Sequence, residues 1–225
     1  TAVNNLNLHV KSGDFFGFLG QNGAGKTTTI KMISGLYNST SGSILINGYD
    51  IYTEPIKAKS LIGYIPDQPF IYEKLTGREF LFFSGGLYSI EKKKLKKIID
   101  EIIEKLEIGD WVDKRTEEYS QGMKQRITIA SALLHDPKLL VVDEPMVGLD
   151  PQSALIVKNV LKEKANNGAA VFMSTHSLNI AEEICTRIGI IKDGNMIFSD
   201  KTEVLETIKG SDHHNLESLF LHLTK

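Results

Sequence analysis

The stretch Gly20-Gln21-Asn22-Gly23-Ala24-Gly25-Lys26-Thr27 decides the fold of this chain. It has the spacing G-x-x-x-x-G-K-[ST], which is typical of a phosphate-binding loop between a strand and a helix. An apolar run from Phe15 to Leu19 precedes it, and a helical pattern from Lys26 to about Leu36 follows it. A chance match in a glycine-rich turn would not explain this strand and helix. The stretch therefore predicts an α/β architecture with a phosphate site at the end of a buried strand.

The residues of this loop have different expected tasks. Glycines let the backbone wrap closely around phosphate oxygens, and the helix that follows adds partial positive charge. We expect Lys26 to bridge the β- and γ-phosphates of a nucleotide and the Thr27 hydroxyl to ligate Mg²⁺. The other residues predicted to bind the phosphates are Gln21, Asn22, Gly23, Ala24, Gly25 and Thr28.

A second candidate site lies at the end of another apolar strand. The run from Leu139 to Val142 ends in the acid pair Asp143 and Glu144. Successive strand residues point to opposite sides, so the two carboxylates can serve different purposes. We expect Asp143 to hold Mg²⁺, through water, and Glu144 to polarise the water that attacks the γ-phosphate. A solvated acid pair is the plain alternative, and the complete phosphate loop elsewhere in the chain argues against it.

Composition excludes several classes of protein. The chain has 225 residues, of which 41% are hydrophobic and 24% charged, so intrinsic disorder is excluded. Its 26 Lys and Arg against 28 Asp and Glu give a net charge of −2, and no nucleic-acid partner is expected. The single cysteine, Cys185, cannot form an internal disulfide. No apolar run approaches the roughly 20 residues that span a bilayer.

The middle of the chain differs from its two flanks. Residues 76–134 are predicted to be helical, because Thr76 and Glu79 have capping-box spacing and Ser120 can cap a further helix. The flanks alternate between strand and helix patterns. Strands are expected at Leu6 to Val10, Ser43 to Asn47, Leu61 to Ile65, Ala169 to Met173, and in a hairpin of Arg187 to Ile191 with Met196 to Ser199. Asp150-Pro151 and Ser177 are expected to start helices, and two short helices are expected to close the chain.

Taken in order, these motifs resemble the nucleotide-binding subunit of ABC transporters. The phosphate loop continues into Thr28, and the acid pair extends as Asp143-Glu144-Pro145-Met146-Val147-Gly148-Leu149-Asp150-Pro151. Tyr119-Ser120-Gln121-Gly122-Met123 lies before the acid pair and Ser174-Thr175-His176 after it. The resemblance covers nearly the whole chain. The bacterial multidrug and ABC-2-type exporters are the subgroup it indicates.

The resemblance implies a fold and a division of the chain. The expected fold is a P-loop NTPase core with a mainly parallel sheet, an N-terminal antiparallel β portion, and a helical subdomain inserted between the Walker A and Walker B motifs. Residues 1–225 would form a single ATPase domain. Residues 1–75 and 135–225 would be its α/β core, and residues 76–134 its helical signature subdomain.

The resemblance also implies roles for individual residues. Lys26 and Thr27 match the Walker A lysine and Mg²⁺ ligand, Asp143 the Walker B aspartate, and Glu144 the catalytic glutamate. Asp150 would be the D-loop aspartate. His176 would be the switch histidine that contacts the γ-phosphate, and it counts with Glu144 and Lys26 as a catalytic residue. The implied cofactors are ATP and Mg²⁺.

Two segments depart from the family pattern. The signature Leu-Ser-Gly-Gly-Gln is Tyr-Ser-Gln-Gly-Met here, although Ser120 and Gly122 are kept. In the family this segment, here Ser120, Gln121 and Gly122, acts in trans on the ATP of a second subunit packed head to tail. The Q-loop glutamine should follow Pro66, where Asp67 stands, with Gln68 next. Either residue could serve as the metal contact.

The resemblance implies partners as well. Separate transmembrane permease subunits would dock near residues 67–88, which are rich in aromatic side chains, unless most of these pack inside the helical subdomain. The second ATPase subunit would be another copy of the chain or a related subunit. The implied function is to power an exporter from the cytoplasmic side of the cell membrane, as a peripheral subunit. The alternative is a soluble, non-transport ABC-type ATPase that acts as an assembly or mechanical factor.

Overall fold

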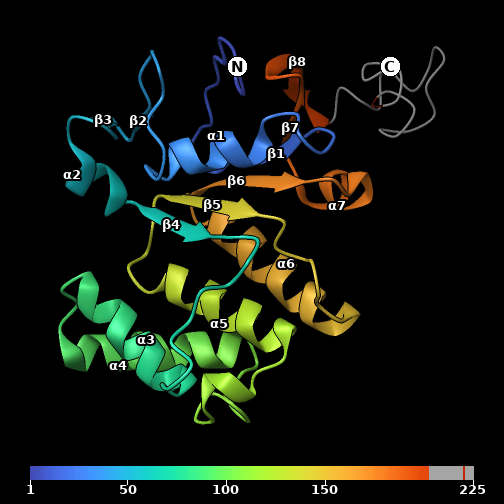
Figure 1. Ribbon diagram of the computed structural model, residues 1–225. Helices are drawn as coiled ribbons and strands as arrows, with labels where there is room; N and C mark the ends of the chain where they lie inside the picture. The colour runs from blue at the N-terminus through green and yellow to red at the C-terminus, as the bar shows by residue number, and fades with distance from the viewer. Residues whose placement is uncertain (203–219, 221–225) are drawn as a thin grey trace.

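A six-stranded sheet organises the chain, in the order β4-β5-β6-β1-β7-β8 (Figure 1). The computed structural model describes residues 1–202 and Phe220. Strands β4, β5, β6, β1 and β7 are parallel, and β8 pairs with β7 in the antiparallel direction. The bounds of the sheet strands are β1 Phe15–Leu19, β4 Ile62–Ile65, β5 Leu139–Asp143, β6 Ala170–Thr175, β7 Arg187–Lys192 and β8 Asn195–Lys201. The expected mainly parallel sheet is confirmed.

Helices cover both faces of this sheet. In Figure 1, α1 lies above the sheet, whereas α5 and α6 lie below it and α3 and α4 lie farthest from it. The bounds of the core helices are α1 Lys26–Ile33, α2 Pro55–Lys59, α6 Pro151–Asn166 and α7 Leu178–Ile184. The remaining helices, which we call the helical lobe, are α3 Gly77–Leu87, α4 Lys92–Lys105, the 3₁₀ turn Thr116–Glu118 and α5 Gln121–Leu133.

Alternation along the strands divides the core into two clusters. Val141 and Phe172 pack with Phe16 and Phe18 on the α1 face of the sheet. Their neighbours along the strands pack instead with the helical lobe and α6, namely Phe15, Leu140, Val142, Val171 and Met173. Successive strand side chains point to opposite faces, so strands buried on both faces must be apolar throughout. The continuous apolar runs in the sequence follow from this constraint.

Side-chain caps set the start of four helices where the sequence predicted them. Thr76 and Glu79 form a reciprocal capping box at α3: the Glu79 backbone N–H donates to Thr76 Oγ1 (3.1 Å), and the Thr76 N–H donates to Glu79 Oε2 (2.8 Å). Ser120 caps α5, Ser177 caps α7, and Asp150 caps α6, where Pro151 follows at the first position. Each cap satisfies an N–H group that has no partner within its helix.

The strand expected at Leu6 to Val10 is not formed. Leu6, Leu8 and Val10 are half-buried against the α1-face cluster, and the polar residues between them are exposed. The alternation therefore reflects side-chain packing, since this segment forms no ladder with a neighbouring strand in the described part of the chain. Asn5, with φ 45°, also departs from extended backbone.

Other boundaries shift by a few residues. The strand expected at Ser43 to Asn47 shrinks to β2 (Leu45–Ile46), because Asn47 and Gly48 adopt positive φ and turn the chain into β3 (Tyr49–Asp50). This hairpin is the antiparallel part that follows α1. The two closing helices lie outside the described residues, apart from Thr202 and Phe220. No helix in the described part of the chain combines the length and apolar character needed to cross a membrane.

The capping box gives a direct test of the helical lobe. Thr76→Ala removes the acceptor for the Glu79 N–H and should lower the free energy of unfolding by about 1 kcal/mol. That change corresponds to a fall in Tm of about 2–4 °C for a domain of this size. Thr40→Ala, at an exposed position outside the helices, is the control. Equal Tm values for both variants would show that the cap does not stabilise α3.

Candidate functional site

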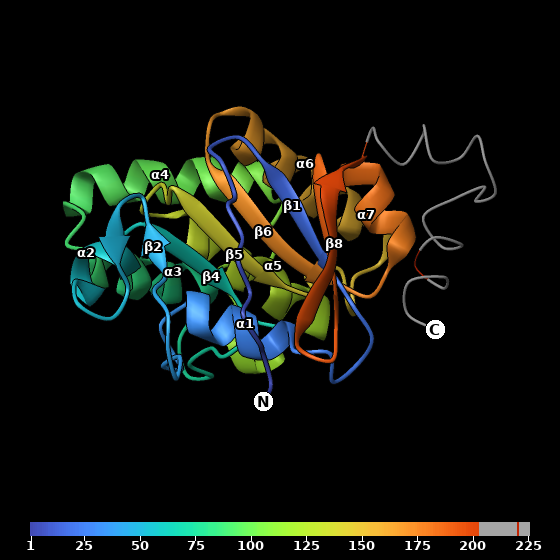
Figure 2. The same ribbon diagram turned by 90° about the horizontal axis from the view of Figure 1, so that it is seen from above.

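Four parallel strands end at one edge of the sheet, and the candidate site residues follow these ends (Figure 2). Leu19 at the end of β1 is in register with Thr175 of β6, and Asp143 of β5 is in register with Ser174. The phosphate loop follows β1, and Asp67 follows β4. Glu144 and His176 follow β5 and β6. Parallel topology therefore gathers residues that are far apart in the sequence.

The phosphate loop turns sharply into α1. Gly25, the residue before the helix, has φ 112°, and a Cβ there would lie 2.5 Å from the carbonyl oxygen of Ala2. Glycine is therefore required for both its backbone conformation and its lack of a side chain. Gln21, Asn22, Gly23 and Thr27 are exposed at this turn, Thr28 is half-buried, and Ala24 is buried. The N-terminus of α1 thus lies behind an open loop, as an anion site requires.

Lys26 lies inside the loop rather than in solvent. Its side chain is folded back, and Nζ donates to the carbonyl oxygens of Gly20 (2.6 Å) and Gln21 (3.2 Å). Only 8% of the residue is exposed. Burial lowers the pKa of the Lys26 ammonium, and the negative charges of Glu144 and Asp143 partly oppose this shift. The ammonium group is thus held at the strand edge between carbonyl oxygens and two acids.

Asp143 is a buried carboxylate with a specific partner. The Ser174 hydroxyl donates a hydrogen bond to its Oδ1 atom across the β5–β6 pair. Burial raises the pKa of Asp143, and the nearby charges of Asp67 and Glu144 raise it further. The Ser174 hydrogen bond and Lys26 act in the opposite direction. Two neighbouring carboxylates and one ammonium group therefore act on the Asp143 carboxylate, so negative charge is in excess around it.

Glu144 and His176 form a pair at the same edge. Glu144 leaves the strand with φ 49°, and its backbone N–H donates to the Ser174 carbonyl (3.2 Å). His176 Nδ1 lies 2.8 Å from Glu144 Oε1. The Glu144 side chain is 17% exposed and that of His176 is 64% exposed. The two adjacent acids therefore have different hydrogen-bond partners, Ser174 for Asp143 and His176 for Glu144.

Asp67 and Gln68 are both exposed after Pro66. The charge of Asp67 raises the pKa of Asp143, and it also contributes, after burial, to the raised pKa of the Tyr64 phenol. The charge of Asp67 therefore acts on the groups of this site. No side-chain hydrogen bond of Gln68 occurs among the residues that the structure describes.

The segment Ser120-Gln121-Gly122 lies apart from this edge. The Ser120 hydroxyl accepts the Met123 N–H (3.3 Å), and Ser120 and Gln121 are exposed at the N-terminus of α5. Within residues 1–202, no hydrogen bond joins Ser120 to the phosphate loop. The neighbour of this segment is the turn before α6, since a Cβ at Gly148 would lie 3.0 Å from Gln121 Cγ. Asp150, which follows that turn, accepts the Ser153 N–H (3.0 Å) and hydroxyl (2.5 Å).

Ser174 is a site residue that sequence analysis did not identify. In the sequence it is part of Ser174-Thr175-His176, where the family resemblance gives a role to His176 alone. Its hydrogen bond to Asp143 depends on the register of two strands that lie far apart in sequence. The sequence does carry one signal for this contact. One apolar run ends at the acid pair and another ends just before His176, and such runs are typical of neighbouring parallel strands.

The donor set fits a hard divalent cation. Magnesium prefers oxygen ligands, and the Thr27 hydroxyl and the Asp143 carboxylate are of that kind. The carboxylates of Asp67 and Glu144 raise the pKa of Asp143 by repulsion, and a cation bound among these groups would reduce that repulsion. In the described chain, no three His, Cys, Asp or Glu side chains form a metal cluster by themselves. Nucleotide oxygens would therefore complete the coordination, as is usual for magnesium.

Comparison with known proteins gives consistent matches. The ABC transporter family profile matches residues 3–147. The linearmycin resistance ATP-binding protein LnrL of Bacillus subtilis (strain 168) is 41% identical over 211 residues, which are 93% of this chain and 68% of that protein.

Solved structures of the same kind also align. The structure of an ATP-binding subunit of an ABC transporter has a TM-score of 0.92 and 30% identity, covering 100% of this chain and 93% of that chain. The dimeric, post-hydrolysis ATP-binding cassette MJ0796, bound to ADP and Pi, has a TM-score of 0.81 and 26% identity, and the match covers 89% of this chain and 90% of that chain. The cbiO1 protein of Clostridium perfringens, part of the ABC transporter complex cbiONQ, has a TM-score of 0.78 and 27% identity, covering 92% and 85%.

The buried carboxylate predicts an unusual pH dependence of stability. Because the pKa of Asp143 is raised on folding, the folded protein holds this proton more tightly than the unfolded chain, and the ionised group destabilises the fold. Asp143→Asn should therefore raise the Tm of the nucleotide-free protein by about 2 °C or more at neutral pH. The gain should shrink as the pH falls toward about 4, where the unfolded carboxyl is also protonated.

Asp136→Asn is the matched control. Its carboxylate pairs with Lys164 (3.0 Å), and this hydrogen bond lowers the pKa of Asp136. That substitution should not stabilise the protein at any pH. Thermal melts of both variants across the pH range would decide, and a Tm gain for Asp143→Asn that is absent or independent of pH would contradict the prediction.

Proposed function

The chain belongs to the ABC transporter family, and we propose that it is the ATP-hydrolysing subunit that powers an exporter. Domains of this family are ATPases that bind ATP and ADP. The observation that carries the proposal is the cluster of Lys26, Asp143, Glu144 and His176 at one sheet edge, with Glu144 and His176 2.8 Å apart. A phosphate loop alone would be compatible with many nucleotide-binding proteins.

The phosphate loop would bind the β- and γ-phosphates. The Lys26 ammonium is already desolvated and held by carbonyl oxygens, so phosphate oxygens can take over those contacts with little loss of hydration. Thr27 and Asp143 would hold Mg²⁺, and the charge of Asp67 near Asp143 supports Asp67 over Gln68 as a further contact. When bound, Mg²⁺ would neutralise charge on the β- and γ-oxygens.

Glu144 would activate the attacking water. Its carboxylate is mostly shielded from solvent, and one oxygen is paired with His176, which leaves the other oxygen available to accept a proton. His176 is more exposed and would orient Glu144 and contact the γ-phosphate. The protein thus positions a base and supplies stabilising charge, as phosphoryl transfer requires.

The signature segment would act on a second subunit. Ser120 and Gln121 are exposed at a capped helix N-terminus and do not contact the phosphate loop of their own chain within the described residues. A head-to-tail dimer would bring them to the γ-phosphate of the partner, with Asp150 near the contact. The dimeric form of the MJ0796 cassette supports the association of two such subunits.

A groove between the core and the helical lobe would receive a separate membrane permease. Its volume is about 300 Å³, and it is lined by Ser34, Lys59, Ile62, Tyr64, Ser84, Leu87, Tyr88, Ser131 and Ala132. Phe70 and Tyr72, in the loop before α3, form an exposed aromatic cluster with Phe83 of α3, with ring centroids 5.9 Å apart for Phe70–Tyr72 and 5.2 Å for Tyr72–Phe83. Ile71 and Phe80 are buried, so only part of this segment is available for docking.

Export from the cytoplasmic side of the membrane is the direction we propose. LnrL, by name a resistance protein, supports export, and the cbiONQ complex supports an assembly with other subunits. The subunit would be peripheral.

The role of Glu144 is testable by a charge-neutral substitution. Glu144→Gln removes the base and should lower ATP turnover by about 100-fold or more. The variant should still bind Mg-ATP and accumulate as an ATP-bound dimer, which light scattering after size-exclusion chromatography detects. Glu104→Gln, at an exposed position on α4, is the control and should keep wild-type turnover. Substantial hydrolysis by Glu144→Gln would exclude Glu144 as the main base.

The docking surface is testable with the full-length protein in native membranes. Purification after gentle solubilisation should recover a polytopic membrane protein in stoichiometric amount. Phe70 is 77% exposed, and Phe70→Ala should weaken this association about tenfold, a loss of about 1.4 kcal/mol. Its Tm should stay at the wild-type value.

Leu45→Ala, at an exposed apolar position on β2, is the matched control and should keep the partner. Recovery of only soluble partners would favour the assembly or mechanical ATPase over the exporter. Equal recovery with Phe70→Ala and wild type would place the permease contact elsewhere on the chain.

A further inference from the structure

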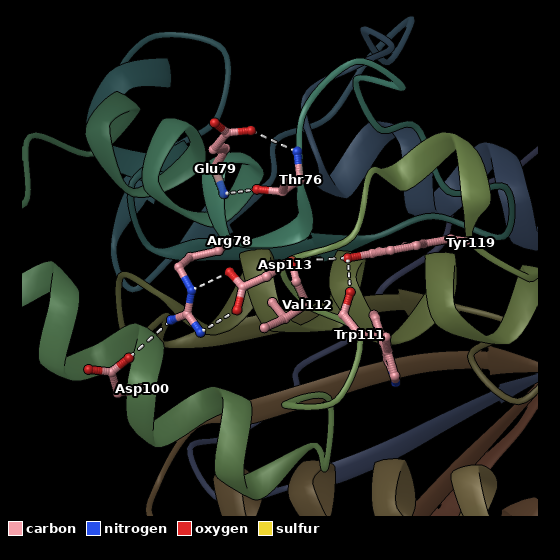
Figure 3. Close-up of polar contacts among 8 residues, drawn as sticks. All are labelled: Thr76, Arg78, Glu79, Asp100, Trp111, Val112, Asp113 and Tyr119. Atoms are coloured by element: carbon pink, nitrogen blue, oxygen red, sulfur yellow. Dashed lines mark hydrogen bonds and ion pairs between the residues drawn. The ribbon is translucent and has the colours of Figure 1, made fainter.

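Tyr119 precedes Ser120 directly and is buried, with 5% of its surface exposed. Its phenolic hydroxyl lies 3.1 Å from the carbonyl oxygen of Trp111 and 3.2 Å from that of Val112 (Figure 3). One proton is shared between these two acceptors. The ring of Tyr119 also packs edge-on against Trp111, with centroids 4.9 Å apart. The ring and the hydroxyl of the residue before the signature serine thus both contact the turn at Trp111–Val112.

Arg78, near the start of α3, binds the turn that contains Trp111, Val112 and Asp113. The Arg78 guanidinium binds both carboxylate oxygens of Asp113 (2.7 and 3.1 Å) and one oxygen of Asp100 on α4 (3.2 Å). The Arg78 backbone N–H donates to the Val112 carbonyl (2.9 Å). The Val112 oxygen therefore accepts from both Arg78 and Tyr119, which places one carbonyl between the start of α3 and the start of α5.

The fit around the hydroxyl is close. A Cβ at Gly77 would lie 2.3 Å from the Tyr119 oxygen and 2.9 Å from the Val112 oxygen, so the helix α3 backbone packs directly on this group. Burial raises the pKa of Tyr119 to about 12, so the hydroxyl stays protonated and remains a donor at physiological pH.

We propose that the Tyr119 hydroxyl positions Ser120 for its action on the nucleotide of the partner subunit. The inference rests on the proposed trans role of Ser120. That role needs the exposed serine hydroxyl and the following N–H groups to be held within about 0.5 Å of a productive geometry. The hydrogen bonds of Ser120 itself stay within the first turn of α5, since its hydroxyl accepts the Met123 N–H and its carbonyl accepts the Lys124 N–H. Tyr119 instead connects it to the turn at Trp111–Val112 and, through the Val112 carbonyl, to Arg78 on α3. Tyr119 is a positioning residue, because it is buried and touches no reacting atom.

Tyr119→Phe removes the hydroxyl and keeps the ring. We expect kcat for ATP to fall about tenfold, since a misplacement of 1 Å can lower a rate by up to about 100-fold. The affinity of the isolated subunit for Mg-ATP should not change, because the phosphate loop is intact. In a Glu144→Gln background, Tyr119→Phe should raise the ATP concentration needed to form the dimer. A purely structural hydroxyl would lower Tm without this separation of kcat from nucleotide affinity.

Tyr52→Phe is the matched control. The Tyr52 hydroxyl accepts the backbone N–H of Ser39 (3.0 Å), so this substitution removes a similar hydrogen bond far from α5. It should leave kcat unchanged. Asp113→Asn, which weakens the Arg78 fork without touching Tyr119, should lower kcat in the same direction and by less.

Ser120→Ala, measured in parallel, separates the two levels of inference. A wild-type kcat for Ser120→Ala would reject the trans role of the serine and so the proposed function of this segment. A reduced kcat for Ser120→Ala together with a wild-type kcat for Tyr119→Phe would overturn the positioning role alone. Equal losses of kcat and of Mg-ATP affinity in Tyr119→Phe would also overturn it, since they would indicate general damage to the fold.

Discussion

The Lys26 ammonium is the positive charge around which the acids of this sheet edge are arranged. Asp143 and Glu144 both act electrostatically on Lys26, and Asp67 acts on Asp143. Buried charges are stable only when they are paired or hydrogen-bonded, and Lys26 meets that condition through the carbonyls of Gly20 and Gln21. Three carboxylates, those of Asp67, Asp143 and Glu144, stand against this one ammonium group, so the site carries an excess of negative charge. A site with this imbalance favours a ligand that brings cations with it, as Mg-ATP does.

The sheet supplies the second constraint. Residues at the ends of β1, β5 and β6 meet only because these strands are parallel and in register, Leu19 with Thr175 and Asp143 with Ser174. A shift of one residue would turn Asp143 to the opposite face. Glu144 adopts positive φ at the same place, directly after Asp143, where the chain leaves β5. Strained backbone of this kind is typical of functional sites.

The sequence predicted the features that depend on local spacing. The phosphate loop, the caps at Thr76, Ser120 and Asp150, and the hairpin around Gly194 are all set by residues within a few positions of each other. The failures depend on partners distant in sequence. Leu6 to Val10 has the alternation of a strand but pairs with no strand among the described residues, and the contact of Ser174 depends on the register of β5 and β6. The preference for Asp67 over Gln68 likewise rests on the charge that faces Asp143, which no spacing rule contains.

In the proposed dimer the two lobes of the chain would serve different nucleotide sites. The core lobe holds the phosphate loop, the acids and His176, whereas the helical lobe presents an exposed serine at a capped helix N-terminus. An N-terminus of this kind stabilises negative charge, yet the serine has no partner group in its own core among the described residues. Besides capping α5, this serine is held by Tyr119 and the Arg78 fork where an anion from outside the subunit could reach it. In the proposed dimer the partner's nucleotide is that anion, and hydrolysis then requires both subunits at each site.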